Sequence, residues 1–113
     1  MKRYTTLAVI IAAVFLSLSI FAAARPKTQT WTGWISDSVC GAKGMSASHK
    51  DCATACVNGK GAKWVFVNSQ TKEVFPIQNQ DAVQESDLDA PVQVTGSVVK
   101  GKSLHVENIQ QEN

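Results

Sequence analysis

Three cysteines and one of the two histidines of this 113-residue chain lie within a single stretch, residues 40–56. The spacing runs from Cys40 over eight residues to His49, over two to Cys52 and over three to Cys56. Thiolate and imidazole groups are the ligands of tetrahedral Zn(II) and of soft ions such as Cu(I), so these four residues are a candidate metal set. The same cysteines are candidates for a disulfide or for a redox-active thiol.

In the disulfide interpretation, Cys40 pairs with Cys52 or with Cys56, at separations of 12 or 16 residues. Closing such a loop stabilises a small domain by about 3 kcal/mol in the chain-entropy model. A bridge between Cys52 and Cys56 is disfavoured if both lie on one helix, since their Cβ atoms point the same way along it. One thiol is left over in either pairing, and it could be inert or could do thiol chemistry, although the Cys-x3-Cys spacing is one residue longer than the thioredoxin-type motif.

Residues 48–59 have the pattern of a short helix that would position these side chains. Ser48 is expected to cap the helix together with Asp51, and Gly59 to end it. At about 100° per residue, one helical face collects three of the four candidates within an arc of about 60°: His49, Cys52 and Cys56. This face could meet Cys40, which follows the first expected strand.

Weaker candidates lie outside this segment. Asp37 could be a catalytic carboxylate, but an aspartate at a strand end is expected to accept hydrogen bonds in a turn. His105 lies in a strand pattern and is expected to be a surface histidine. Three tryptophans could stack a ligand, although core or rim packing is the expected role in so small a domain: Trp31, Trp34 and Trp64. No recognisable Ser-His-Asp set, phosphate loop or carboxylate pair is present, so we expect a non-enzymatic role.

The elements that must carry these residues are mainly strands. Pro76 suggests an edge strand and Gly96 a bulge, and one short helix is expected within residues 79–90. Five strands in so short a chain favour closure of the sheet, which predicts an OB-like barrel over residues 31–110 after a polar tether at 25–30; a small open β-sandwich is the alternative. The strand patterns are alternating or β-branched runs at residues 31–36, 63–68, 72–78, 91–100 and 102–109.

The first 24 residues predict export. Lys2 and Arg3 precede an uncharged apolar run at residues 7–24, and small residues precede an expected cut after Ala24, which is the layout of a secretory signal peptide. An uncleaved membrane anchor is the alternative, because the run reaches the lower limit of about 18 residues for crossing a bilayer. We expect a periplasmic or secreted protein.

Charge narrows the classes of partner. Removal of the signal lowers the Lys and Arg residues from 11 to 9, which equals the 9 Asp and Glu residues. A neutral domain lacks the basic surface that binds nucleic acid or docks on an anionic membrane. The expected partners are therefore a small ligand, a metal ion such as Zn or Cu, or an envelope protein.

Three strings carry a resemblance to a known family: GWISDSVCGAKG at residues 33–44, HKDCATACVNGKGAKWVFV at 49–67 and VQVTGSVVKGKSLHVENI at 92–109. They resemble a family of small secreted bacterial proteins of unknown function. The resemblance implies an exported single-domain β-barrel and matches at all four metal candidates. In many members a further histidine follows the Cys-Gly element, where this chain reads AKGM at residues 42–45. The sequence thus predicts an exported, non-enzymatic binding or envelope module with a disulfide-bonded or metal-bound Cys/His segment, and alternatively a thiol-active redox protein or a metal-binding protein.

Overall fold

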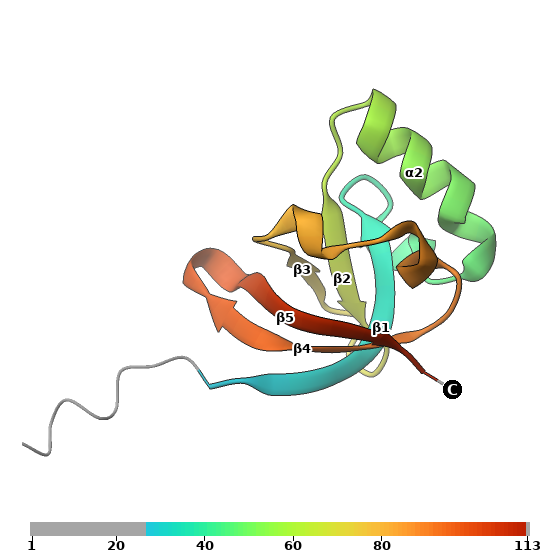
Figure 1. Cartoon of the computed structure of the whole chain (residues 1–113). Coiled ribbons are helices and arrows are strands. Elements are labelled where there is room, and N and C mark those ends of the chain that lie inside the picture. The colour runs from blue at the N-terminus through green and yellow to red at the C-terminus, as the bar shows by residue number, and fades with distance from the viewer. Residues whose placement is uncertain (1–26, 113) are drawn as a thin grey trace, which may run out of the picture.

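The structure is a computed structural model that describes residues 27–112, so the expected signal peptide at residues 1–24 lies outside the described residues. Within the described residues, five strands form one antiparallel sheet in the order β3-β2-β1-β4-β5, and one α-helix, α2 (Lys50–Gly59), lies near the end of β1 (Figure 1). The mainly β fold with a short helix after the first strand is confirmed. The strands are β1 (Gln29–Asp37), β2 (Trp64–Asn68), β3 (Val74–Pro76), β4 (Val92–Val99) and β5 (Ser103–Gln111).

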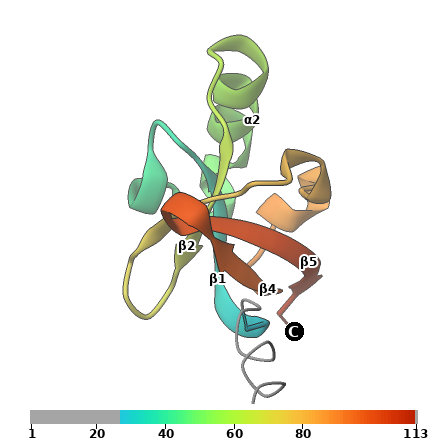
Figure 2. The same ribbon diagram turned by 90° about the vertical axis from the view of Figure 1, so that its left-hand side faces the viewer.

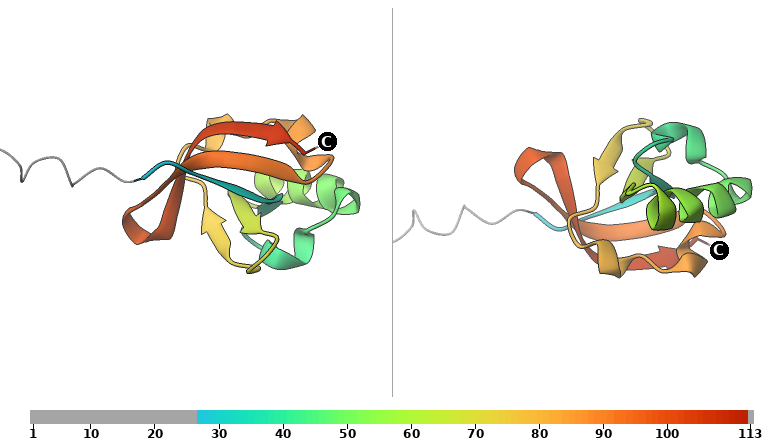
Figure 3. Two further views of the ribbon diagram at one scale, coloured as in Figure 1. Left: turned by 90° about the horizontal axis from the view of Figure 1, so that it is seen from below. Right: turned by 90° about the horizontal axis from the view of Figure 1, so that it is seen from above.

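The two edges of the sheet approach each other without closing it. After β3, Ile77 forms a single parallel bridge to Leu104 of β5, and the Gln78 N–H donates to the Leu104 carbonyl at 2.8 Å. A closed barrel needs a ladder of hydrogen bonds between its first and last strands. The described part of the chain therefore establishes a strongly curved five-stranded sheet, seen from two further directions in Figure 3, and not the closed OB-like barrel.

β1 is the central strand and uses its two halves differently. Its second half pairs with β2, its first half pairs with β4, and Gly33 takes part in both ladders. A Cβ atom at Gly33 would overlap the Val67 carbonyl of β2, so only glycine permits this approach.

Two predictions about the strands are confirmed, and one about the connection between β3 and β4 is wrong. Pro76 lies in the edge strand β3, and the β4–β5 register shifts between Thr95 and Gly96, as expected of a bulge. The single helix expected within residues 79–90 is instead two 3-10 turns, η4 (Gln80–Ala82) and η5 (Glu85–Leu88). Apolar residues are too sparse there to form the continuous stripe that stabilises a longer helix.

The core lies on one face of the curved sheet. Trp31 and Trp64 are partly buried and pack against this core. α2 contacts β1 and lies beyond its upper end in Figure 2. The helix buries Ala53 and Cys56. No helix within residues 27–112 is long and apolar enough to cross a membrane. The buried members of the core are Ile35, Phe66, Ile77, Leu88, Val92, Val94, Leu104 and Val106.

Candidate metal centre

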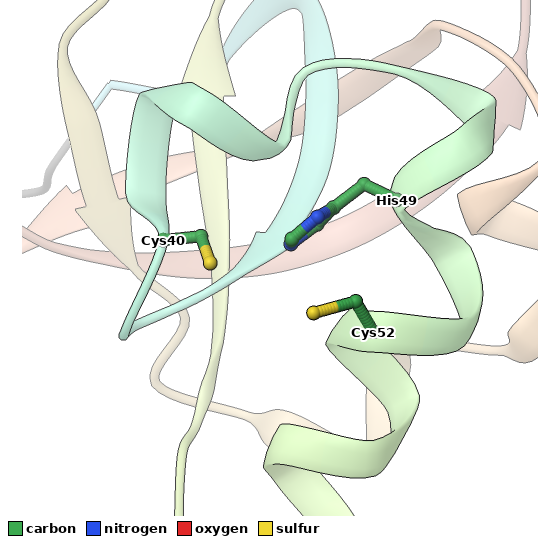
Figure 4. Close-up of side chains that lie close together, drawn as sticks. All are labelled: Cys40, His49 and Cys52. Carbon is green, nitrogen blue, oxygen red and sulfur yellow. The ribbon is translucent and has the colours of Figure 1, made fainter.

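Three of the four predicted ligands meet at the end of β1. One ligand atom from each of Cys40, His49 and Cys52 lies within 4.8 Å of the others. Cys40 comes from the turn after β1, His49 immediately precedes α2, and Cys52 lies in the first turn of α2, so two separate parts of the chain supply the group (Figure 4). Cys52 is exposed, whereas the other two are half-buried.

The turn that carries Cys40 is built by the residues around it. The Asp37 carboxylate accepts hydrogen bonds from the backbone N–H groups of Val39 at 2.9 Å and Cys40 at 3.0 Å. The Ser36 hydroxyl donates to the carbonyl of Gly41 at 2.9 Å, and Gly41 has a φ of 54°, a conformation that favours glycine. The expected turn role of Asp37 is confirmed, and it fixes the backbone at Cys40.

Asp37 also contacts the histidine. Its Oδ1 lies 2.8 Å from His49 Nε2, and its side chain is fully buried. Burial raises the pKa of Asp37, but the hydrogen bonds with His49 and with the N–H groups of Cys40 and Val39 outweigh it and hold the pKa below the ordinary value. Asp37 is therefore an ionised carboxylate at neutral pH, and the sequence pattern did not reveal its contact with His49.

Gly44 makes room for the imidazole. A Cβ atom at this position would lie 2.5 Å from Cδ2 and 2.8 Å from Nε2 of His49, and it would overlap the Ser36 hydroxyl. Non-bonded carbon atoms in ordinary contact are at least about 3.5 Å apart. The His49 ring thus packs directly against the backbone of Gly44, in the 3-10 turn η2 (Gly41–Gly44), which is a second supporting contact that the sequence did not reveal.

Cys56 lies one helical turn beyond Cys52 and outside the three-residue group. It is buried, and its pKa is raised by that burial, by the charge of Asp37 and by Cys52. The pKa of Cys40 is raised by the same causes, with burial again the largest. Both thiols are therefore protonated at neutral pH unless a cation replaces the proton. All three cysteines are free thiols in the structure, so the expected disulfide stays a prediction.

The start of α2 differs from expectation. Ser48 does not cap the helix: it lies in the 3-10 turn η3 (Ala47–His49), its hydroxyl contacts that of Ser46 at 2.9 Å, and α2 begins at Lys50. The backbone of His49 nevertheless has α-region angles, φ −83° and ψ −8°, so the direction of its side chain follows that of the residues in α2. The prediction that His49 and Cys52 share a face therefore holds, although its capping argument was wrong.

The other predicted site residues lie elsewhere. Trp31 stacks on Phe75 with ring centroids 6.4 Å apart and planes inclined by 28°. The apolar depression that these two rings line has no room for a water molecule. Trp34 is half-buried, and a ligand-stacking role for the tryptophans stays a prediction. His105 is exposed and its Nδ1 contacts Gln78 at 3.0 Å, as expected of a surface histidine.

The arrangement at the end of β1 can hold a cation. It joins two soft sulfur groups and an imidazole in front of a buried carboxylate, and this donor set suits Zn(II) and Cu(I) better than Mg(II) or Ca(II). Comparison with protein-family models, with curated proteins and with solved structures yields no match for this chain, so its function must be inferred from this geometry.

Proposed function

We propose that this chain is an exported protein that binds one soft metal ion, Zn(II) or Cu(I), through Cys40, His49 and Cys52. The observation that carries the proposal is the approach of three ligand atoms to within 4.8 Å from two separate parts of the chain. Zinc ligands at about 2.0–2.3 Å from one ion lie about 3.5–4 Å from each other, so small side-chain rotations would complete the site.

The histidine is supported as metal-binding histidines are. A ligand histidine almost always has its second ring nitrogen held by a carboxylate, a carbonyl or water, and such partners affect metal affinity about 10–100-fold. Asp37 holds His49 Nε2, and a metal bound through Nδ1 would leave that hydrogen bond in place. The buried negative charge of Asp37 also favours a cation over a neutral occupant.

The number of ligands bears on the kind of site. Structural zinc sites are closed by four protein ligands, whereas sites that exchange water or substrate keep one position open. Cys56 is next to Cys52 and is a candidate for a fourth ligand after rotation. With Cys52 exposed, the three-residue group favours binding and exchange of the ion over a purely structural role.

The proposal also includes export of the chain and a relation of its domain to the OB-like barrels. The signal-like start of the chain supports export to a compartment outside the cytoplasm. The contact between Ile77 and Leu104 supports a domain related to the OB-like barrels, with its two edge strands drawn together. No enzymatic step is needed for this role.

A second candidate function is thiol–disulfide exchange. The observation that favours it is the position of Cys52, which is exposed and adjacent to both Cys40 and Cys56. Against it, burial and Asp37 raise the pKa of Cys40 and Cys56, whereas catalytic cysteines of this class have lowered pKa values.

Zinc binding of the reduced protein tests the proposal. Protein purified from cells that express the full chain is titrated with Zn²⁺ at neutral pH in competition with a chromophoric chelator, and one ion should bind per chain. His49→Ala should weaken binding at least about tenfold, and Cys40→Ser and Cys52→Ser should do the same or more. His105→Ala is the matched control, since that histidine is exposed and lies on β5. Equal affinities of the His49→Ala and His105→Ala variants would overturn the assignment.

A further inference from the structure

We infer that Cys40 and Cys52 are also a redox pair, and that their disulfide and the bound metal ion are mutually exclusive states of one site. A disulfide oxidant would then empty the site, and reduction would restore it. The metal half of this inference rests on the proposed function, whereas the choice of disulfide partners rests on geometry alone.

Position selects Cys52 over Cys56 as the partner of Cys40. The sulfur atoms of Cys40 and Cys52 already lie within 4.8 Å of each other, and Cys56 falls outside this group. A disulfide needs a sulfur–sulfur distance of about 2.05 Å. Cys52 is exposed, so its side chain has space to rotate and an oxidant can reach it, while Cys56 is buried.

The geometry of a helix disfavours the remaining possible disulfide, between Cys52 and Cys56. Side chains four residues apart on a helix have Cβ atoms about 5–6 Å apart, whereas a disulfide holds its Cβ atoms about 3.5–4.5 Å apart. Cys52 and Cys56 both lie within α2 and have this spacing. Cys40 lies on a different element and is free of that constraint.

The exchange balances with a small organic disulfide as the oxidant. In the metal-free protein, the thiolate of Cys52 attacks the oxidant, forms a mixed disulfide and releases one thiol; Cys40 then attacks the mixed disulfide and releases the second thiol. The two protein sulfurs lose two electrons, the oxidant gains them, and the two thiol protons leave on the products. In the metal-bound protein both sulfurs begin as thiolates, so the two protons come from solvent and the metal ion leaves with its charge unchanged.

A substitution at His49 distinguishes the metal-bound state from the disulfide state. It is a ligand in the proposed metal site but takes no part in the bond between the two sulfurs. His49→Ala should therefore lose zinc affinity and still form the disulfide, whereas Cys52→Ser should lose both. Cys56→Ser should still form the disulfide, and for that measurement it is the matched control for Cys52→Ser because both residues lie on α2.

The test exposes reduced protein, purified from cells that express the full chain, to oxidised glutathione with and without one equivalent of Zn²⁺. Samples are quenched with acid, alkylated, digested with trypsin and analysed by mass spectrometry, while a chromophoric chelator reports released zinc. Cleavage after Lys43, Lys50 and Lys60 puts Cys40 on one peptide and the other two cysteines on another, so fragmentation and the Cys56→Ser variant assign the partner.

We expect a Cys40–Cys52 link in the metal-free protein, formation slowed at least about tenfold by zinc, and one zinc ion released per disulfide. A Cys40–Cys56 or Cys52–Cys56 link as the main product would overturn the inference, as would zinc that stays bound after the Cys40–Cys52 disulfide is complete. A protein that binds zinc but forms no disulfide also overturns it and leaves the proposed function standing. A protein that forms the predicted disulfide but binds no zinc refutes the metal function and the exclusion, and leaves the redox pair.

Discussion

Gly44→Ala perturbs the position of the His49 ring without replacing any proposed metal ligand. The new Cβ atom would lie 2.5 Å from His49 Cδ2 and 2.8 Å from Nε2, about 1 Å closer than an ordinary contact. The new Cβ atom also overlaps the Ser36 hydroxyl, so both that hydroxyl and the ring must move. A ring shift of about 1 Å would lengthen the 2.8 Å hydrogen bond to Asp37 beyond hydrogen-bonding range. Loss of such an outer-sphere contact weakens metal binding about 10–100-fold, which is about 1.4–2.7 kcal/mol.

Competition titration with zinc measures this loss, and Gly59→Ala is the matched control. A Cβ atom at Gly59 would have no atom within 4 Å, and neither glycine has a positive φ, so both backbones accept alanine. Gly59→Ala should bind zinc as the wild type does. Zinc affinity of Gly44→Ala within about twofold of the control would refute the inferred role of the ring position. Thermal unfolding of the metal-free variants checks that each one is folded.

Three further predictions concern stability, each measured by urea unfolding. The folded-state pKa of Asp37 is lowered, so its carboxylate contributes stability above the unfolded-state pKa, and this stability is lost as the pH falls through the folded-state pKa. Between neutral pH and about pH 3, the wild type should therefore lose stability more steeply than Asp37→Asn. Parallel curves for the two proteins would contradict this. Burial raises the pKa of Asp87, and the hydrogen bond from the Gln84 N–H offsets this only in part, so the ionised Asp87 carboxylate destabilises the fold. Asp87→Asn should stabilise the protein at neutral pH, and this gain should vanish in acid. An equal gain at both pH values would contradict the prediction. In Gly33→Ala the new Cβ meets the Val67 carbonyl, a backbone atom that cannot rotate away, so we expect a loss of about 1–3 kcal/mol, and an unchanged unfolding midpoint would refute the close approach.

Local rules account for what the sequence predicted well. Alternation of side chains located the strands, proline marked the edge strand at Pro76, and glycine marked the bulge at Gly96. The helical period of 3.6 residues also placed His49 and Cys52 on one face, because it depends only on spacing along the chain. Each of these signals lies within a few residues of the feature that it predicts.

Contacts between distant segments account for what the sequence missed. The pairing of Asp37 with His49 joins residues 12 apart, across two turns whose path no pattern specifies. Asp87 lies in a polar stretch of the sequence, but it forms a capping box with Gln84 and is only 8% exposed. Closure of the sheet likewise depends on the approach of β3 to β5, and alternation within each strand carries no information about that distance.

In the proposed site, metal binding would be coupled to the packing of α2 against β1. A ten-residue helix is marginal in isolation, and α2 buries only Ala53 and Cys56. Its start is tied to β1 by His49, so a metal or a disulfide that joins Cys52 to Cys40 would fasten that same end. The hydrophobic core includes none of the proposed ligands, so filling the proposed site would require no rearrangement of the core. Because Cys52 is exposed in the first turn of this short helix, the proposed site suits an exchange of its occupant more than a purely structural role.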